Sequence, residues 1–285
     1  LNPSAIVVHT SLLGSGGPLS PLAGYGYHAA AIAGYYEVVG WPDLPPDGPY
    51  LAYTDTIAPR FITPALLAAI DRHRRTGKGC VIEAAQLECG LQLMTPELLD
   101  YQVNGRKASR RGNRELDIAP QGVYPVEGRD RWIGITISSD ETWATFKKLM
   151  GNPEWAEAAA FDTVECRLDM HDFLDDRIGE WSSQYDGRAL EALLLAERIP
   201  AGIVSRSSDL LVDPQYQHLS FYRWHEHAAM GEVPYAGHQY TIEGYDHGPR
   251  AAAPLLGEHT FEVLSDLLGL NADEIAEIAV SGALG

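Results

Sequence analysis

The sequence predicts an α/β fold in which a larger α/β part is followed by a smaller α+β domain. Short continuous apolar runs, typical of buried strands, occur at residues 5–10 and 80–84. Between these runs, apolar residues recur at helical spacing from Phe61 to Ile70, which predicts an amphipathic helix. After a polar, basic stretch the pattern changes, and strand-like and helix-like segments follow in a new order.

The first part is expected to alternate between strand and helix. A glycine-rich loop, Gly14–Pro18, follows the first strand. Small apolar residues from 27 to 39 predict a buried helix that stops at Gly40. The amphipathic helix follows Asp55, with Pro59 and Pro64 near its start, and ends in a basic turn closed by glycine at 72–79. The strand at 80–84 comes next, and after it a helix over 86–99 that is interrupted near Pro96.

Composition and pattern divide the chain into four segments. The third contains a strand at 131–137 and helices at 169–182 and 186–198, and the fourth ends in helical stretches at 254–268 and 271–280. The expected segments are an α/β part that carries Asp55 (1–105), a basic linker (106–118), a small α+β domain (119–212) and a C-terminal segment (213–285).

Charge and composition exclude several classes of partner. The chain has 285 residues, 45% of them hydrophobic, which is enough for a sizeable core. It carries 21 Lys+Arg against 39 Asp+Glu, a net charge of −18. Such a surface repels phosphate backbones, so nucleic acid is not an expected partner. No apolar run approaches the roughly 20 residues that cross a bilayer, so a membrane is not expected either.

The cysteines and the first residues predict the compartment. Cys80, Cys89 and Cys166 are too few and too scattered for a disulfide framework, which favours a reducing, cytoplasmic environment. The first residues lack both the basic head and the long apolar core of a signal peptide. Because the chain enters a strand almost at once, we expect it to begin within a domain.

Asp55 is the candidate with the clearest chemical use. An Asp immediately before a helix is commonly an N-cap that accepts backbone N–H bonds and meets the positive end of the helix dipole. The same position keeps a carboxylate ionised. An ionised carboxylate can attack an activated acyl carbon to give a covalent mixed anhydride. Cap and nucleophile are therefore compatible interpretations.

Other motifs have simpler interpretations. The Gly14–Pro18 loop lacks the spacing of a dinucleotide fingerprint or a P-loop, which favours a plain turn over a phosphate contact. His225 and His227 share one strand face; polar surface is favoured, a metal site is the alternative, and we expect no metal. The basic segment 106–114 is interpreted as a solvated linker, with phosphate binding as its alternative. Serine-hydrolase and zinc-peptidase motifs are absent from the sequence.

Taken together, weak motifs in a fixed order resemble one enzyme family. They are Leu1-Asn2-Pro3 with Gly14, Pro21–Tyr25 through Gly34 and Gly40, Asp55 with Leu66–Ala69, Arg72, Thr76–Gly79 and Val81, Pro120–Pro125 with Arg131–Ile133, Ile199–Val204 with Leu210 and Asp213–Gln215, and Pro254–Thr260. In this order the chain resembles a class III CoA-transferase of the CaiB/BaiF, formyl-CoA transferase-like family, without the family's usual N-terminal segment.

The resemblance implies a fold and an assembly. It implies a partial Rossmann-like large domain, a smaller α+β domain and a C-terminal segment that returns to the large domain. It also implies an interlocked homodimer, or a heteromer with a chain that supplies the N-terminal unit. The coenzyme A thioester enters as a substrate, and no permanently bound cofactor is expected.

The resemblance also implies roles for individual residues. Asp55 would attack an acyl-CoA thioester, and the CoA thiolate and the acceptor carboxylate would then exchange through an enzyme–CoA thioester. Tyr25 and Gly26 would line the substrate pocket, and the loop around Gln121 and Gly122 would close over the intermediate. Many members carry an acidic residue where Gly26 stands. Related racemases use a His-Asp pair there, and Tyr25-Gly26 cannot perform that proton chemistry.

The expected function is acyl-CoA:carboxylate CoA transfer. One alternative is a non-catalytic subunit or pseudo-enzyme half, motivated by Gly26 and the missing N-terminal unit. The other alternative is an acyl-CoA lyase or hydratase on the same scaffold.

Overall fold

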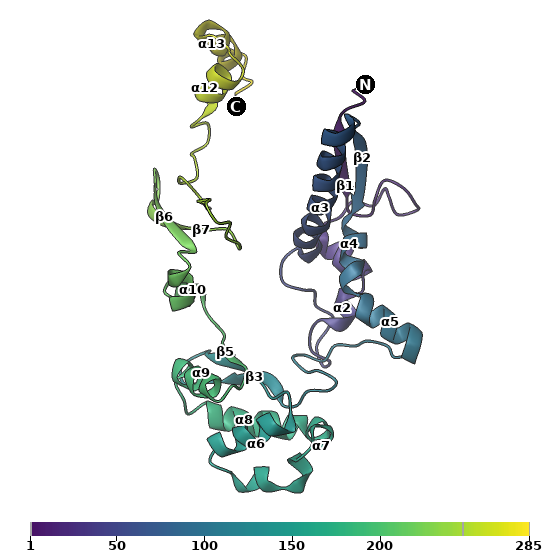
Figure 1. Ribbon diagram of the computed structural model, residues 1–285, viewed down its shortest axis with the longest axis vertical. Helices are drawn as coiled ribbons and strands as arrows, with labels where there is room; N and C mark the ends of the chain where they lie inside the picture. The colour runs from purple at the N-terminus through teal and green to yellow at the C-terminus, as the bar shows by residue number, and fades with distance from the viewer. Residues whose placement is uncertain (1, 247, 285) are drawn as a thin grey trace. The chain divides into compact units, whose positions relative to one another are not determined.

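The computed structural model describes residues 2–246 and 248–284. It divides the chain into two compact units, Leu1–Ile203 and Val204–Gly285, which are described separately (Figure 1). The elements confirm a mixture of helices and strands. The expected limits of the four segments stay a prediction. No helix in the described ranges is long and apolar enough to cross a membrane.

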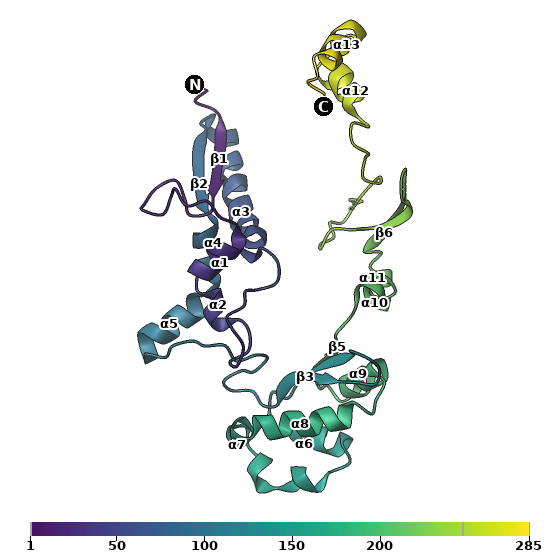
Figure 2. The same cartoon turned by 180° about the vertical axis from the view of Figure 1, so that it is seen from behind.

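The first unit opens with a two-stranded parallel sheet and a long helix beside it. Strand β1 (Ile6–Ser11) pairs in register with β2 (Cys80–Ala85), so Ile6 lies opposite Cys80. Helix α3 (Tyr53–Thr76), the last of three helices between them, lies along both strands (Figures 1 and 2). It ends at Gly77, whose φ of 69° is the left-handed conformation that glycine adopts most readily. The expected glycine-closed turn is thus confirmed.

Shorter helices surround the beginning of α3. The helix expected over 27–39 is wrong as a single element, because Gly34 adopts a φ of 93° and separates α1 (Gly26–Ile32) from α2 (Tyr35–Val38). After β2 follow α4 (Gln86–Leu93) and α5 (Thr95–Asn104), which confirms the expected break. Two small apolar clusters hold these helices together, Ala30, Ala33, Tyr35 and Met94 in one and Ile57, Ala58 and Cys89 in the other.

The largest core lies in the remainder of the first unit. Strands β3 (Gln121–Pro125), β4 (Trp132–Thr136) and β5 (Ala201–Ile203) form an antiparallel sheet in that order. The fully buried side chains of this core include Ile133 of the sheet and, from the helices packed on it, Trp143, Phe146, Leu174 and Leu190. The helices of this region are α6 (Asp140–Leu149), α7 (Val164–Asp169), α8 (His171–Ser182) and α9 (Gly187–Ala196), with 3-10 turns at Glu154–Glu157 and Ala159–Phe161.

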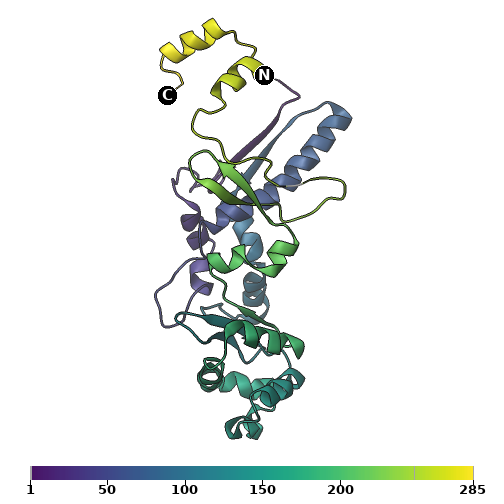
Figure 3. The same cartoon turned by 90° about the vertical axis from the view of Figure 1, so that its left-hand side faces the viewer.

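The second unit is built around a hairpin. Strands β6 (Tyr222–His227) and β7 (Gly231–Ala236) pair antiparallel and are drawn in green in Figure 3. The other elements are α10 (Ser207–Leu211), α11 (Pro214–His218), α12 (Thr260–Glu262), a π-helical turn (Val263–Leu267) and α13 (Ala272–Val280).

Candidate active site

Asp55 lies in the first turn of α3. The helix begins at Tyr53 with Ala52 at the N-cap, so the expectation that Asp55 caps the helix is wrong: it is the third helical residue. The backbone of Ala52, rather than a side chain, starts the helix. In the first turn a carboxylate still meets the positive end of the helix dipole. The Asp55 side chain is exposed, so a substrate can reach it.

Gly26 and Asp55 are in direct contact. A Cβ placed on Gly26 would lie 2.5 Å from Asp55 Oδ2 and 3.0 Å from Asp55 Cγ. Only glycine therefore lets this carboxylate approach so closely. Thr54, fully buried, donates from Oγ1 to the Gly26 carbonyl over 3.0 Å. This bond ties the first turn of α3 to the start of α1.

Gln86 is the other neighbour of Asp55, and the sequence interpretation missed it. Its Nε2 donates to Asp55 Oδ1 over 2.5 Å. Gln86 is the first residue of α4 and directly follows β2. The carboxyl ends of parallel strands are the usual place for ligand-binding groups in α/β folds, so its position after a predicted strand was an available signal.

Tyr25 directly precedes Gly26 and is the N-cap of α1. Its backbone N–H donates to His28 Nδ1 over 3.0 Å, and its side chain is 76% exposed. The structure thus brings Gly26 and Asp55 together, with Tyr25 next to Gly26 in the chain. That Tyr25 lines an acyl pocket stays a prediction.

Gln121 and Gly122 make their contacts in a different part of the first unit. Gln121 Nε2 donates to the Asn113 carbonyl over 3.0 Å, and a Cβ on Gly122 would lie 2.8 Å from the Tyr124 ring. Both residues belong to β3, so the expectation of a loop at these positions is wrong. Their pairing with Thr136 and Ile135 of β4 gives this segment its extended form.

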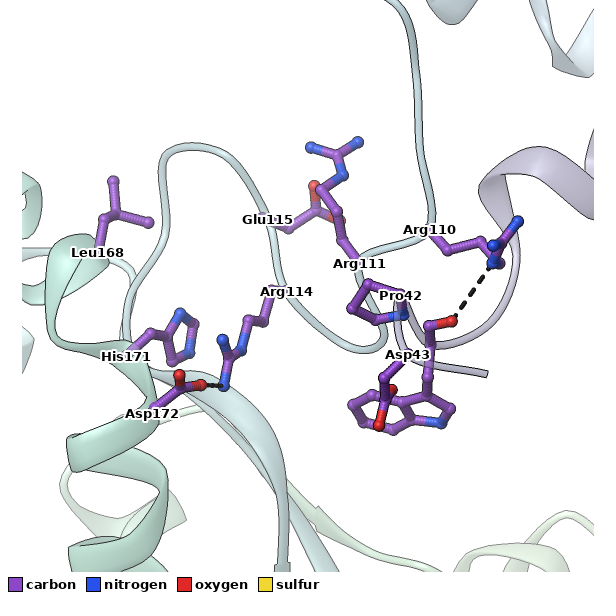
Figure 4. A pocket seen from close by; sticks show the side chains of 10 residues that line it. Pro42, Asp43, Arg110, Arg111, Arg114, Glu115, Leu168, His171 and Asp172 are labelled. Atoms are coloured by element: carbon purple, nitrogen blue, oxygen red, sulfur yellow. Dashed lines mark hydrogen bonds and ion pairs between the residues drawn. The ribbon is translucent and has the colours of Figure 1, made fainter. Parts of the chain in front are cut away.

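The basic linker borders a pocket of about 570 Å³ (Figure 4). Arg110 Nε donates to the Trp41 carbonyl over 3.3 Å. Arg114 donates to Asp172 and Asp175, each over 2.6 Å. Two of the arginines thus bind groups of the chain itself, which favours a structural role for this segment over phosphate binding.

The Gly14–Pro18 loop binds groups of its own chain. Ser15 donates through its backbone N–H, over 2.6 Å, and through its hydroxyl to Glu83 Oε1. These hydrogen bonds, the hydroxyl's first, lower the pKa of Glu83. The Gly14 N–H donates to Ser11 Oγ over 2.9 Å. A turn fixed by Ser11 and Glu83 accounts for this loop without a bound phosphate.

The two histidines on the β6 face are engaged by backbone groups. His227 Nδ1 accepts hydrogen bonds from the N–H groups of Ala229 and Met230, over 3.1 and 3.2 Å. His225 Nε2 lies 3.0 Å from the Pro249 carbonyl oxygen. Within residues 2–246 and 248–284, no group of three or more His, Cys, Asp or Glu side chains is arranged to hold a metal ion. These contacts favour the structural interpretation of His225 and His227.

The chain belongs to CoA-transferase family III, which it matches over residues 1–260. It is 30% identical to the succinyl-CoA–D-citramalate CoA-transferase of Chloroflexus aurantiacus, over 97% of this chain and 68% of that protein. It is 23% identical to the human succinyl-CoA:glutarate CoA-transferase, over 98% of this chain and 64% of that protein. The resemblance deduced from the motifs is thereby confirmed.

A solved structure shares the fold. A CaiB/BaiF family protein from Brucella suis superimposes with a TM-score of 0.82 and 25% identity, over 93% of this chain and 68% of that chain. The mixed α/β class is confirmed, and the Rossmann-like character of the large domain stays a prediction. The chain also resembles Rv1866 of Mycobacterium tuberculosis, named a probable CoA-transferase, at 27% identity over 96% of this chain. It spans 35% of the length of that protein, compared with 68% and 64% of the two relatives above.

Proposed function

We propose that this protein transfers coenzyme A from an acyl-CoA to a carboxylic acid, with Asp55 as the nucleophile. The observation that carries the proposal is the exposed first-turn carboxylate, held by Gln86 and packed on Gly26. The names of the relatives make succinyl-CoA the first donor to test, with small dicarboxylic acids as acceptors.

In the first half of the proposed reaction, Asp55 first takes up the acyl group of the donor and then exchanges it for CoA. Oδ2 attacks the thioester carbonyl, the new C–O bond gives a mixed anhydride, and the CoA thiolate leaves with the electron pair of the C–S bond. The thiolate then attacks Cγ of Asp55. A Cγ–S bond forms, and the donor's carboxylate leaves with Oδ2.

The second half runs in reverse with the acceptor. The acceptor carboxylate attacks Cγ, one of its oxygens becomes the bridge of a new anhydride, and the thiolate leaves. The thiolate next attacks the acceptor's acyl carbon and releases the new acyl-CoA and the Asp55 carboxylate. A thioester is already activated, so the site contributes mainly positioning and groups that meet the developing oxyanions. CoA is a substrate throughout.

Intact-protein mass spectrometry after mixing with succinyl-CoA tests the nucleophile. We expect an adduct that maps to the Asp55 peptide and is lost in Asp55→Asn. Asp71→Asn, an exposed carboxylate on the same helix paired with Arg75, is the matched control. An unlabelled Asp55 in a folded, fully assembled protein would contradict the proposal and favour the non-catalytic alternative. Thioester that disappears without transfer would favour the lyase or hydratase alternative.

We also propose that the active enzyme is an assembly, either an interlocked homodimer or a heteromer. Parallel strands are normally covered on both faces. Yet Val7, Val8 and Val81 of β1 and β2 are 48%, 37% and 71% exposed. One relative, from Chloroflexus aurantiacus, is named an alpha subunit of a succinyl-CoA–L-malate CoA-transferase. Light scattering on the purified chain should give a mass above that of one chain, alone or with a partner; a fully active monomer would contradict this.

A further inference from the structure

The two oxygens of the Asp55 carboxylate lie in different surroundings. Oδ1 accepts the 2.5 Å hydrogen bond from Gln86 Nε2. Oδ2 lies against the α-carbon of Gly26, where a Cβ would approach it to 2.5 Å. Because a donor holds Oδ1, Oδ2 is the oxygen with the freer electron pairs. The two atoms are therefore suited to different parts of the proposed reaction.

The orientation of the Gln86 amide is fixed by this contact. Its other end, Oε1, is buried and makes no hydrogen bond within the described structure. Turning the amide over would bring two oxygens together at Asp55 Oδ1, so the N–H must face the carboxylate. A buried carbonyl without a donor costs free energy, and such groups call for an explanation. Here the orientation delivers an N–H to Oδ1.

We propose that Gln86 stabilises the oxyanion that develops on Asp55 Oδ1 whenever the carbonyl carbon of Asp55 is attacked. This inference rests on the proposed function. When the CoA thiolate attacks Cγ, the Cγ–S bond forms and the electron pair of the Cγ–Oδ1 double bond moves to Oδ1. Collapse restores that double bond and expels the carboxylate that carries Oδ2. Gln86 Nε2 already points at the atom that holds the negative charge in between.

The same amide has no such role when Oδ2 attacks the substrate. In that step the oxyanion forms on the acyl oxygen of the substrate, whereas the Gln86 N–H remains bound to Oδ1. Gln86 should therefore accelerate the two steps at the enzyme's carbonyl carbon and leave acylation of Asp55 nearly unchanged. A residue that merely kept Asp55 in place would affect all steps alike.

Rapid acid quench and intact-protein mass spectrometry separate these steps. The anhydride adds the acyl group to the protein and the thioester adds CoA, so one spectrum reports both. In Gln86→Leu we expect the anhydride to form at nearly the normal rate and the thioester about 10²-fold more slowly, the usual effect of losing one oxyanion donor. Gln92→Leu, an exposed glutamine of the same helix, should behave as the unmodified protein.

A second variant tests the donor itself. In Gln86→Glu a protonated carboxyl can donate to Oδ1, but an ionised one repels Asp55. Thioester formation should therefore recover as the pH falls, a dependence that Gln86→Leu lacks. This profile keeps the test decisive if Gln86→Leu does not fold.

Two results in Gln86→Leu would overturn the role of Gln86: equal slowing of anhydride and thioester formation, or an unchanged rate of thioester formation. A pH profile of Gln86→Glu parallel to that of the unmodified protein would overturn it as well. Absence of any adduct at Asp55 in the unmodified protein would instead overturn the proposed function. The two failures are therefore distinguishable.

Discussion

Replacing Gly26 by alanine tests whether the proposed nucleophile depends on its close contact with the backbone of α1. The new methyl group would lie 2.5 Å from Asp55 Oδ2 and 3.0 Å from Ala52 Cβ. Gly26 does not have a positive φ, so alanine fits the backbone at this position. The closest conflict is with the exposed carboxylate of Asp55, which can move away only by disturbing its hydrogen bond to Gln86.

The size of the effect follows from these distances. Ordinary van der Waals contacts of a Cβ begin at 3.4 Å, so Oδ2 must retreat by about 1 Å. A carboxylate that moves by this much also displaces Oδ1 and disturbs its 2.5 Å hydrogen bond from Gln86. Misplacement of a reacting group by about 1 Å can lower the rate about 10²-fold. Helix propensity favours alanine over glycine by up to about 1 kcal/mol, so stability should be little changed.

The assay is kcat/KM for CoA transfer from succinyl-CoA, measured beside the thermal unfolding midpoint. Gly179→Ala is the matched control, because that helical glycine has its nearest neighbour, Pro125 Cδ, at an ordinary 3.5 Å. We expect Gly26→Ala to lose about 10²-fold in rate while Gly179→Ala keeps its activity. Full activity of Gly26→Ala would refute the reasoning, since the carboxylate would then function from a displaced position.

Three further predictions concern stability. Thr54→Val removes the buried hydrogen bond to the Gly26 carbonyl and should lower the free energy of unfolding by about 1–3 kcal/mol in urea titrations; no loss would contradict its role in joining α1 to α3. Arg167→Met removes a fully buried guanidinium bonded to Asp140 and to two backbone carbonyls and should cost about 3 kcal/mol; a neutral effect would mean that packing alone maintains this core. Burial, the leading cause, lowers the pKa of His171 below its usual 6.5, so the unfolded chain takes up a proton first as the pH falls. Stability should therefore decline below about pH 6.5, and His171→Gln should flatten that part of the profile.

Elements set by local pattern were predictable from the sequence. The apolar runs gave β1 and β2 within a residue or two, because parallel strands are apolar along their whole length. The end of α3 followed from a basic last turn and Gly77. The helices expected at 169–182 and 186–198 likewise match α8 and α9 within a few residues.

Elements set by backbone conformation or distant pairing were not predictable in this way. Gly34 lies in an apolar run that continues on both sides, and only its φ of 93° shows that the helix breaks there. Gln121 and Gly122 follow a proline in a glycine-containing stretch, which is typical of a loop. Their partners in β4 are Thr136 and Ile135, and that pairing makes the segment a strand.

The candidate site was predicted in part for the same reason. Asp55 could be singled out because a carboxylate at the start of a helix is a local feature. Gln86 lies 31 residues further along, and only the parallel pairing of β2 with β1 beside α3 brings its amide to Asp55. The direct contact of Gly26 with Asp55 likewise depends on the packing of α1 against α3.

Gly26 also limits which side chains can stand beside Asp55. An acidic side chain at this position would begin with a Cβ 2.5 Å from Asp55 Oδ2 and would bring a second carboxylate to the first. Adjacent carboxylates raise one another's pKa and come to share a proton, which suits acid–base chemistry. Because Gly26 has no side chain, it brings no second carboxylate to Asp55, and the space beside Oδ2 is too small for one. A single carboxylate with an amide N–H on Oδ1 suits attack on a thioester better than proton transfer. Gly26 therefore supports the proposed role of Asp55 as a nucleophile.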